Sequence, residues 1–118
     1  MFTKSGTFGE EKLESGVVNI GFGHTPKDGN SNWVKYVSDG IFINVDTSSG
    51  NFINVPLYLV SIGGSGSHWV LTGSNAIYGA TNKGFTVYVR RPDLPSEVTV
   101  DWAKKSGWYI NWIGIESR

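Results

Sequence analysis

The C-terminal stretch "GWYINWIGIESR" at 107–118 constrains the fold more than any other segment. Successive side chains of a β-strand point to opposite faces. The two alternating sets here are Trp108, Ile110, Trp112 and Gly114 on one side, and Tyr109, Asn111, Ile113 and Ile115 on the other. A strand in a surface-lying antiparallel sheet shows one apolar and one polar face, whereas this strand is apolar on both. We therefore expect both faces to be covered, the second one by another copy of the chain or by the glycine-rich segment 62–68.

Short runs rich in Val, Ile, Thr and aromatic residues follow one another along most of the chain, separated by turn-forming Gly, Asn, Asp, Ser and Pro. The candidate strands are 16–22, 33–37, 40–46, 56–62, 69–72, 75–80, 84–91, 97–103 and 108–116. The only helical candidate is "GEEKLES" at 9–15, which is too short to be stable alone. This pattern predicts an all-β protein with one antiparallel β-sandwich.

Composition excludes several classes of function. Ten basic and ten acidic residues balance, so the chain lacks the positive surface of a nucleic-acid-binding protein. No apolar run is long enough to span a membrane, so we expect no membrane insertion. The polar start "MFTKSGTFGEEKLESG" lacks the apolar core of a signal peptide. We expect a protein that is cytoplasmic or released by a non-classical route.

Catalytic and metal-binding patterns are weak. The glycine run "IGGSGSHW" at 62–69 precedes a strand-like segment rather than the helix that a phosphate-binding loop requires. The two histidines, His24 and His68, are far apart in sequence, and there is no cysteine, which disfavours a zinc site. No Gly-x-Ser-x-Gly turn opens a helix. We expect no catalytic residues, no metal and no cofactor.

Tryptophans flank several of the expected loops, at positions 33, 69, 102 and 108. An indole beside polar turn residues can stack on the apolar face of a sugar while nearby amides and carboxylates bond its hydroxyls. Packing at the ends of the sandwich explains any single one of these tryptophans equally well.

Four segments together resemble the H-type lectin family, which includes the snail agglutinins and the C-terminal module of the discoidins. The segments are "ESGVV" at 14–18, "IFINVDTSSGNFINVPLYLVSI" at 41–62, "TNKGFTVYV" at 81–89 and "INWIGIES" at 110–117. They supply the Ser-Gly opening, the Phe-rich segment before a strand-initiating proline, the Gly-Phe pair after a turn and the closing Trp-Ile-x-Ile strand. The resemblance covers residues 14 to 117, in the expected order.

The resemblance implies a sandwich of about six main strands over residues 14–118, preceded by an N-terminal segment 1–13. It also implies a homotrimer that binds glycans, often of the N-acetylgalactosamine or galactose type. The family's early-loop acid and glycine fall on Asp28 and Gly29, with Asn30 beside them. The arginine that the family carries before the Gly-Phe turn is missing, so Arg90 or His68 would replace it, and Trp69 or Trp102 would supply the stacking indole.

We therefore predict a non-enzymatic carbohydrate-binding module that presents its sites multivalently. The expected ligand-binding residues are Asp28, Gly29, Asn30, His68, Trp69, Arg90 and Trp102. The alternative is a receptor-binding or structural tip module of a larger assembly, such as a phage fibre or a toxin, that uses the same fold for protein contacts.

Overall fold

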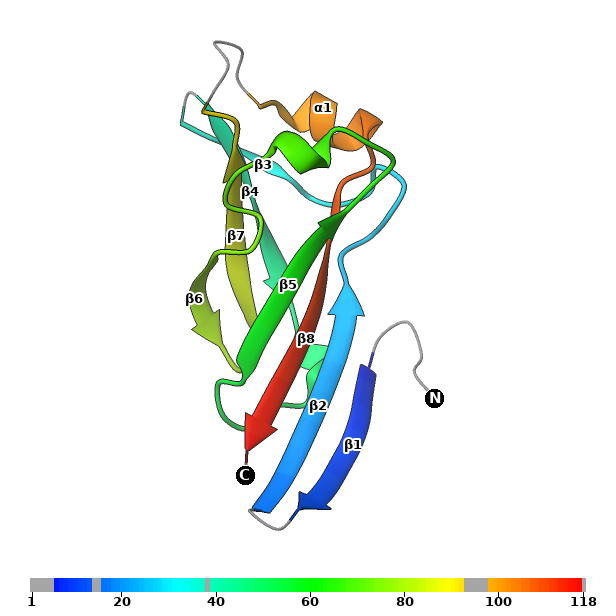
Figure 1. Cartoon of the computed structure of the whole chain (residues 1–118), viewed down its shortest axis with the longest axis vertical. Coiled ribbons are helices and arrows are strands. Elements are labelled where there is room, and N and C mark those ends of the chain that lie inside the picture. Colours follow the sequence, from blue (N-terminus) through cyan, green and yellow to red (C-terminus); the bar gives the residue numbers. More distant parts are fainter. Residues whose placement is uncertain (1–5, 14–15, 38, 93–97, 118) are drawn as a thin grey trace.

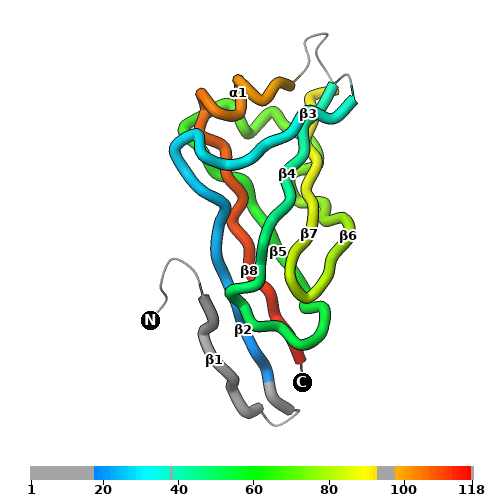
Figure 2. Tube along the Cα trace, turned by 180° about the vertical axis from the view of Figure 1, so that it is seen from behind, coloured from blue at the N-terminus to red at the C-terminus, as the bar shows by residue number. Residues whose placement is uncertain are grey.

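The computed structural model describes residues 6–13, 16–37, 39–92 and 98–117, with side chains from residue 18 onward. It contains two four-stranded sheets that face each other (Figures 1 and 2). In spatial order, the first sheet consists of β1 (Gly6–Leu13), β2 (Gly16–His24), β8 (Tyr109–Ser117) and β5 (Leu57–Gly63). The second consists of β3 (Val34–Tyr36), β4 (Gly40–Asp46), β7 (Gly84–Arg90) and β6 (Ile77–Thr81). Every pairing is antiparallel, so the predicted antiparallel all-β sandwich is confirmed.

The core lies between the two sheets and is built from alternate residues of their strands. Its buried members include Ile41, Ile43, Val45, Phe85, Val87 and Val89 from the second sheet, and Tyr58, Ile110 and Trp112 from the first. The rings of Tyr58 and Phe85 meet across the interior with centroids 4.7 Å apart. The period-two alternation in the sequence is therefore the pattern that selects which face of each strand is buried.

Strand β8 lies in the middle of the first sheet, between β2 and β5. Its inner side carries Ile110 and Trp112, both almost completely buried, and Trp108 just before the strand has no exposed surface. Ile113 and Ile115 point to the outer side and are only partly buried by this chain. The core thus covers one apolar face of β8, and the other is not fully covered within the described part of the chain.

A helix, α1 (Val100–Lys105), replaces the strand predicted at 97–103. Thr99 caps it, since its side chain accepts a hydrogen bond from the backbone N–H of Trp102 at 3.1 Å. Asp101 lies in the first turn, and Lys104 and Lys105 lie in the last, where their charges complement the helix dipole. The prediction was wrong because the alternating valines of this segment outweighed its helix start and stop signals.

One further strand prediction was wrong. Residues 69–72, predicted as a strand, contain part of a 3₁₀ turn, η2 (His68–Val70), followed by a single bridge between Thr72 and Arg90. No stable helix is expected from "GEEKLES" at 9–15, and residues 9–13 of it belong to β1, which pairs with β2. The described residues contain eight strands, whereas the resemblance implies about six main strands. A second 3₁₀ turn, η1 (Ser48–Gly50), follows β4.

Candidate functional site

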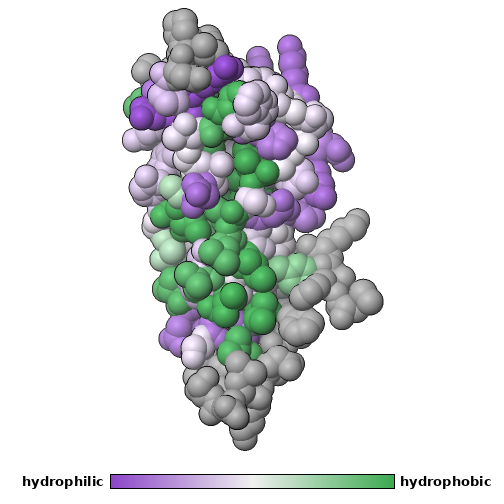
Figure 3. Space-filling model, viewed as in Figure 1, coloured by the Kyte–Doolittle hydropathy of each residue, from purple (hydrophilic) through white to green (hydrophobic). Residues whose placement is uncertain are grey.

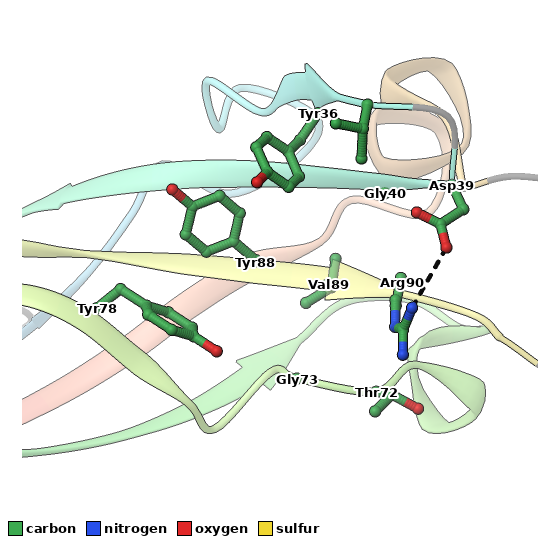
Figure 4. A pocket seen from close by; sticks show the side chains of 10 residues that line it. Tyr36, Asp39, Gly40, Thr72, Gly73, Tyr78, Tyr88, Val89 and Arg90 are labelled. Atoms are coloured by element: carbon green, nitrogen blue, oxygen red, sulfur yellow. Dashed lines mark hydrogen bonds and ion pairs between the residues drawn. The ribbon is translucent and has the colours of Figure 1, made fainter.

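A tyrosine-lined cleft lies on the outer face of the second sheet. We call it the tyrosine cleft; its volume is about 580 Å³, and its lining includes Tyr36, Tyr78, Tyr88, Asp39 and Arg90 (Figure 4). Tyr88 is central: its ring centroid lies 4.8 Å from that of Tyr36 and 5.2 Å from that of Tyr78. Tyr36 and Tyr78 are 45% and 54% exposed, so their rings are available to a ligand.

Strand register creates the hollow. Tyr36 pairs with Gly40 on the neighbouring strand, and Gly40 pairs with Arg90 on the next one. Directly opposed residues of an antiparallel pair share a face of the sheet, so Tyr36, Gly40 and Arg90 form one row across three strands. Because Gly40 has no side chain, the centre of this row, between Tyr36 and Arg90, is empty. A Cβ at Gly40 would lie only 2.8 Å from the carbonyl oxygen of Val89. The close approach of these strands therefore requires glycine, and the missing side chain leaves room in the cleft.

A charged pair closes one end of the cleft. The Nη1 atom of Arg90 lies 3.5 Å from Oδ2 of Asp39, and both side chains are about half exposed. The backbone of Arg90 exchanges two hydrogen bonds with Thr72, at 2.8 and 3.0 Å. The pair is a weak exposed contact, but the backbone bonds fix the position from which the guanidinium extends.

These groups match the chemistry that a neutral saccharide presents. The apolar C–H face of a sugar ring stacks on an aromatic ring, while its hydroxyls exchange hydrogen bonds with carboxylate, guanidinium and phenol groups. The tyrosine cleft provides all of these within one surface depression. Its volume falls within the range of about 300–1,000 Å³ typical of small-molecule sites.

Three of the residues predicted for the site lie together in the turn between β2 and β3. Asp28 is exposed and adopts a left-handed backbone with φ of 59°. Asn30 folds back on the turn, since its Nδ2 donates to the carbonyl of Lys27 at 3.0 Å. Gly29 has φ of 82°, and a Cβ there would lie 2.9 Å from the Lys104 carbonyl oxygen. The group that approaches Gly29 in this structure is therefore the end of α1.

The other four predicted residues lie on three different elements. Arg90 is in the tyrosine cleft, at the end of β7. His68 and Trp69 are in η2, where Nδ1 of His68 lies 3.3 Å from the Gly66 carbonyl and Trp69 is 87% exposed. Trp102 is half-buried on α1, with its ring 5.0 Å from that of Trp108. Asp28 and Arg90 line different hollows.

Sequence reasoning missed the tyrosines of the cleft. The available signal was the outward position of Tyr88 in "GFTVYVRR", where Phe85, Val87 and Val89 occupy the inward positions. An aromatic residue on the outer side of a half-buried strand is a candidate contact residue. Its partners come from β3 and β6, so the cluster itself becomes visible only once the strand order is known.

The outer face of the first sheet carries an apolar patch that runs along the molecule (Figure 3). Two cross-strand rows form it, and we call them the apolar face: Ile20, Ile115 and Leu57, and Phe22, Ile113 and Leu59. Leu57 and Leu59 are 63% and 55% exposed. The next row, His24, Asn111 and Ser61, is polar. A shallow hollow of about 310 Å³ lies between β5 and β8 beside Leu59 and Ile113.

Within the part of the chain that the structure describes, no three His, Asp or Glu side chains gather as a metal site requires. No helix in the same residues is long and apolar enough to cross a membrane. Comparison of the chain with family models, curated proteins and solved structures finds no match.

Proposed function

We propose that this protein is a carbohydrate-binding module of the H-type lectin kind, and that the tyrosine cleft is its sugar site. The observation that carries the proposal is the convergence of Tyr36, Tyr78 and Tyr88 on one hollow that ends at the Asp39–Arg90 pair. A sugar ring stacks on Tyr88 or its neighbours, and the charged pair bonds its hydroxyls. Arg90, one of the residues predicted from the sequence, takes the place of the missing family arginine.

We propose further that the chain assembles as a homotrimer through the apolar face. Leaving Leu57, Leu59 and their neighbours in water is unfavourable, by about 25 cal/mol for each Å² of apolar surface. A stable interface covers about 800 Å² per partner, and we propose that the two rows of the apolar face form its centre. Neither row of the face contains a charged side chain that association would have to desolvate.

The two surfaces are compatible because they lie on opposite outer faces of the sandwich. The tyrosine cleft is on the second sheet and the apolar face is on the first. Association through the first sheet therefore leaves the cleft open to ligand. Three weak sites on one assembly bind a multivalent surface far more tightly than one site does.

The apolar face also supports the alternative function, a tip module that docks onto a different protein. The mass of the purified chain separates the two uses of this face. A particle of three chain masses at micromolar concentration supports self-assembly, whereas a monomer there would assign the face to another partner.

A glycan array probed with the purified assembly tests the sugar-binding proposal. We expect binding to neutral saccharides, with signals that rise steeply with glycan density on the surface. Monomeric Leu59→Asp protein should bind the same saccharides with a much weaker density dependence. Absence of binding to any saccharide on a broad array would overturn the carbohydrate function and favour the tip module.

A further inference from the structure

A third hollow, about 460 Å³ in volume, lies at the α1 end of the sandwich, and the proposed sugar site does not use it. We call it the lysine pocket. Its lining includes Lys27, Lys104, Lys105, Asp28, Ser65 and Tyr109. Three segments that are distant in sequence meet there: the turn after β2, the glycine-rich loop after β5, and the end of α1.

The charge of this pocket contrasts with that of the whole chain. The chain has equal numbers of acidic and basic residues, but the pocket gathers three lysines and one aspartate. All three lysines are exposed, and in the described part of the chain none forms an ion pair. The lining therefore carries an excess of positive charge, and a concave surface with such an excess concentrates anions.

Backbone contacts hold the three segments in place. The backbone N–H of Ser65 donates to the Ser106 carbonyl at 2.8 Å, and Ser65 Oγ donates to the same oxygen at 3.0 Å. Gly29 packs against the Lys104 carbonyl, as described above. The pocket therefore exists before any ligand arrives, which reduces the ordering cost of binding.

One lysine is already oriented. Nζ of Lys27 lies 4.9 Å from the centroid of the Tyr109 ring, a favourable cation–π contact. Lys104 and Lys105 follow one another in the last turn of α1, and both line the pocket.

We propose that the lysine pocket binds a sulfate or phosphate group carried by a saccharide, so that the protein recognises acidic glycans through a site separate from the tyrosine cleft. The saccharide rests on the function proposed above, whereas the anion site rests on the pocket alone. Asp28 and the C-terminal end of α1 both oppose binding here, because Asp28 is the one carboxylate in the lining and the last carbonyls of a helix carry partial negative charge; the three ammonium groups must outweigh them.

The test is an NMR titration of the full chain with sodium sulfate, sodium phosphate and a sulfated oligosaccharide, against sodium chloride at matched ionic strength. We expect amide shifts confined to the turn at 27–30, to Ser65 and to the segment 104–107. The sulfated oligosaccharide should bind about tenfold more tightly than its unsulfated counterpart, a difference of about 1.4 kcal/mol. Tighter binding of free sulfate than of the sulfated oligosaccharide contradicts the assignment to a glycan.

Three variants make the test specific. Lys104→Gln combined with Lys105→Gln should weaken sulfate binding about tenfold, whereas Lys83→Gln, an exposed lysine in the turn between β6 and β7, should leave it unchanged. Asp28→Asn should strengthen it. Shifts spread over the whole surface, or an equal loss in the Lys83 variant, overturn the anion site.

The same samples separate this inference from the proposed function. The double lysine variant should keep its affinity for a neutral saccharide, and Tyr88→Ala should keep its affinity for inorganic sulfate. If the protein binds sulfate but no neutral saccharide, the lysine pocket stands and the proposed sugar site does not. If it binds a neutral saccharide but no sulfate, the sugar site stands and the lysine pocket does not.

Discussion

The indole N–H of Trp33 donates a hydrogen bond to the backbone carbonyl of Trp108 at 3.0 Å, and both residues are buried. Residues 75 positions apart are joined in this way, and the bond ties the segment before β3 to the start of β8. The loops that surround the α1 end of the sandwich are thereby held against the core.

Trp33→Phe should remove this bond and leave the Trp108 carbonyl unsatisfied. We expect a loss of about 1–3 kcal/mol in the free energy of unfolding, measured by urea denaturation. Trp69→Phe is the matched control because Trp69 is almost fully exposed, and exposed substitutions of this kind change stability by less than about 0.5 kcal/mol. Equal stability of the two variants would contradict a structural role for the bond.

Gly114→Ala should destabilise the protein because β8 passes directly beneath Phe52. A Cβ at residue 114 would lie 2.5 Å from the Phe52 ring, and Phe52 is itself buried. Overpacking of this kind costs about 1–3 kcal/mol. At Gly66 a Cβ meets nothing within 4 Å, so Gly66→Ala should unfold at nearly the wild-type temperature. If Gly114→Ala and Gly66→Ala had the same melting temperature, Phe52 would have to move aside to make room for the added methyl group.

Leu59→Asp should dissociate the proposed trimer, because a carboxylate on the apolar face would be buried without a partner. Light scattering should give one chain mass for this variant and three for the wild type. Asn44→Asp adds the same charge to the outer face of the second sheet, where residue 44 is exposed, and should remain trimeric. Dissociation of both variants to the same extent would indicate a general effect of charge.

Tyr58 gives the stability a specific dependence on high pH. Burial raises the pKa of its phenol above the ordinary value of 10.0, and the charge of Glu116 acts in the same direction, while the bond to Thr47 opposes it. The folded protein therefore keeps this proton to a higher pH than the unfolded chain does. Its contribution to stability is complete below pH 10 and is lost as the pH rises through the folded pKa.

Urea denaturation on either side of pH 10 measures this contribution. The Tyr58 hydroxyl donates to the Thr81 carbonyl at 2.7 Å and lies 2.7 Å from Thr47 Oγ1. Tyr58→Phe should thus be less stable at pH 8, by about 1–3 kcal/mol, but should lose less additional stability above pH 10. If wild type and Tyr58→Phe lose the same amount of stability above pH 10, groups other than Tyr58 cause the loss at high pH.

The sequence predicts most of the strands because their alternation is strong. The prediction at 40–46 coincides with β4, and the two-faced apolar pattern at 108–116 corresponds to a central strand of the first sheet. The segment 97–103 was assigned wrongly because Val98 and Val100 are apolar at alternate positions, although a cap at Thr99 started a helix. The alternation suggested a strand to sequence reasoning, whereas in the structure the Thr99 cap starts a helix.

The candidate site was less accessible to sequence reasoning. Arg90 was predicted, but Tyr36, Tyr78 and Tyr88 come from three strands, and only the order β3-β4-β7-β6 brings them together. Asp28 and Gly29 were singled out together, and the structure places their turn against the end of α1. Register and strand order, which a single sequence does not specify, determine which polar and aromatic groups share a hollow.

Calorimetric titration of a saccharide selected on the array into wild type, Tyr88→Ala and Phe42→Ala measures what the tyrosine cleft contributes to sugar binding. Phe42 is the control because its ring also packs against Tyr36 and Tyr88, with centroids 6.0 and 5.4 Å away, but it is not part of the cleft lining. If the tyrosine cleft is the sugar site, Tyr88→Ala should lose at least about 1 kcal/mol of binding free energy, with Phe42→Ala close to wild type. Undiminished binding by a folded Tyr88→Ala protein would show that the sugar does not bind in the tyrosine cleft.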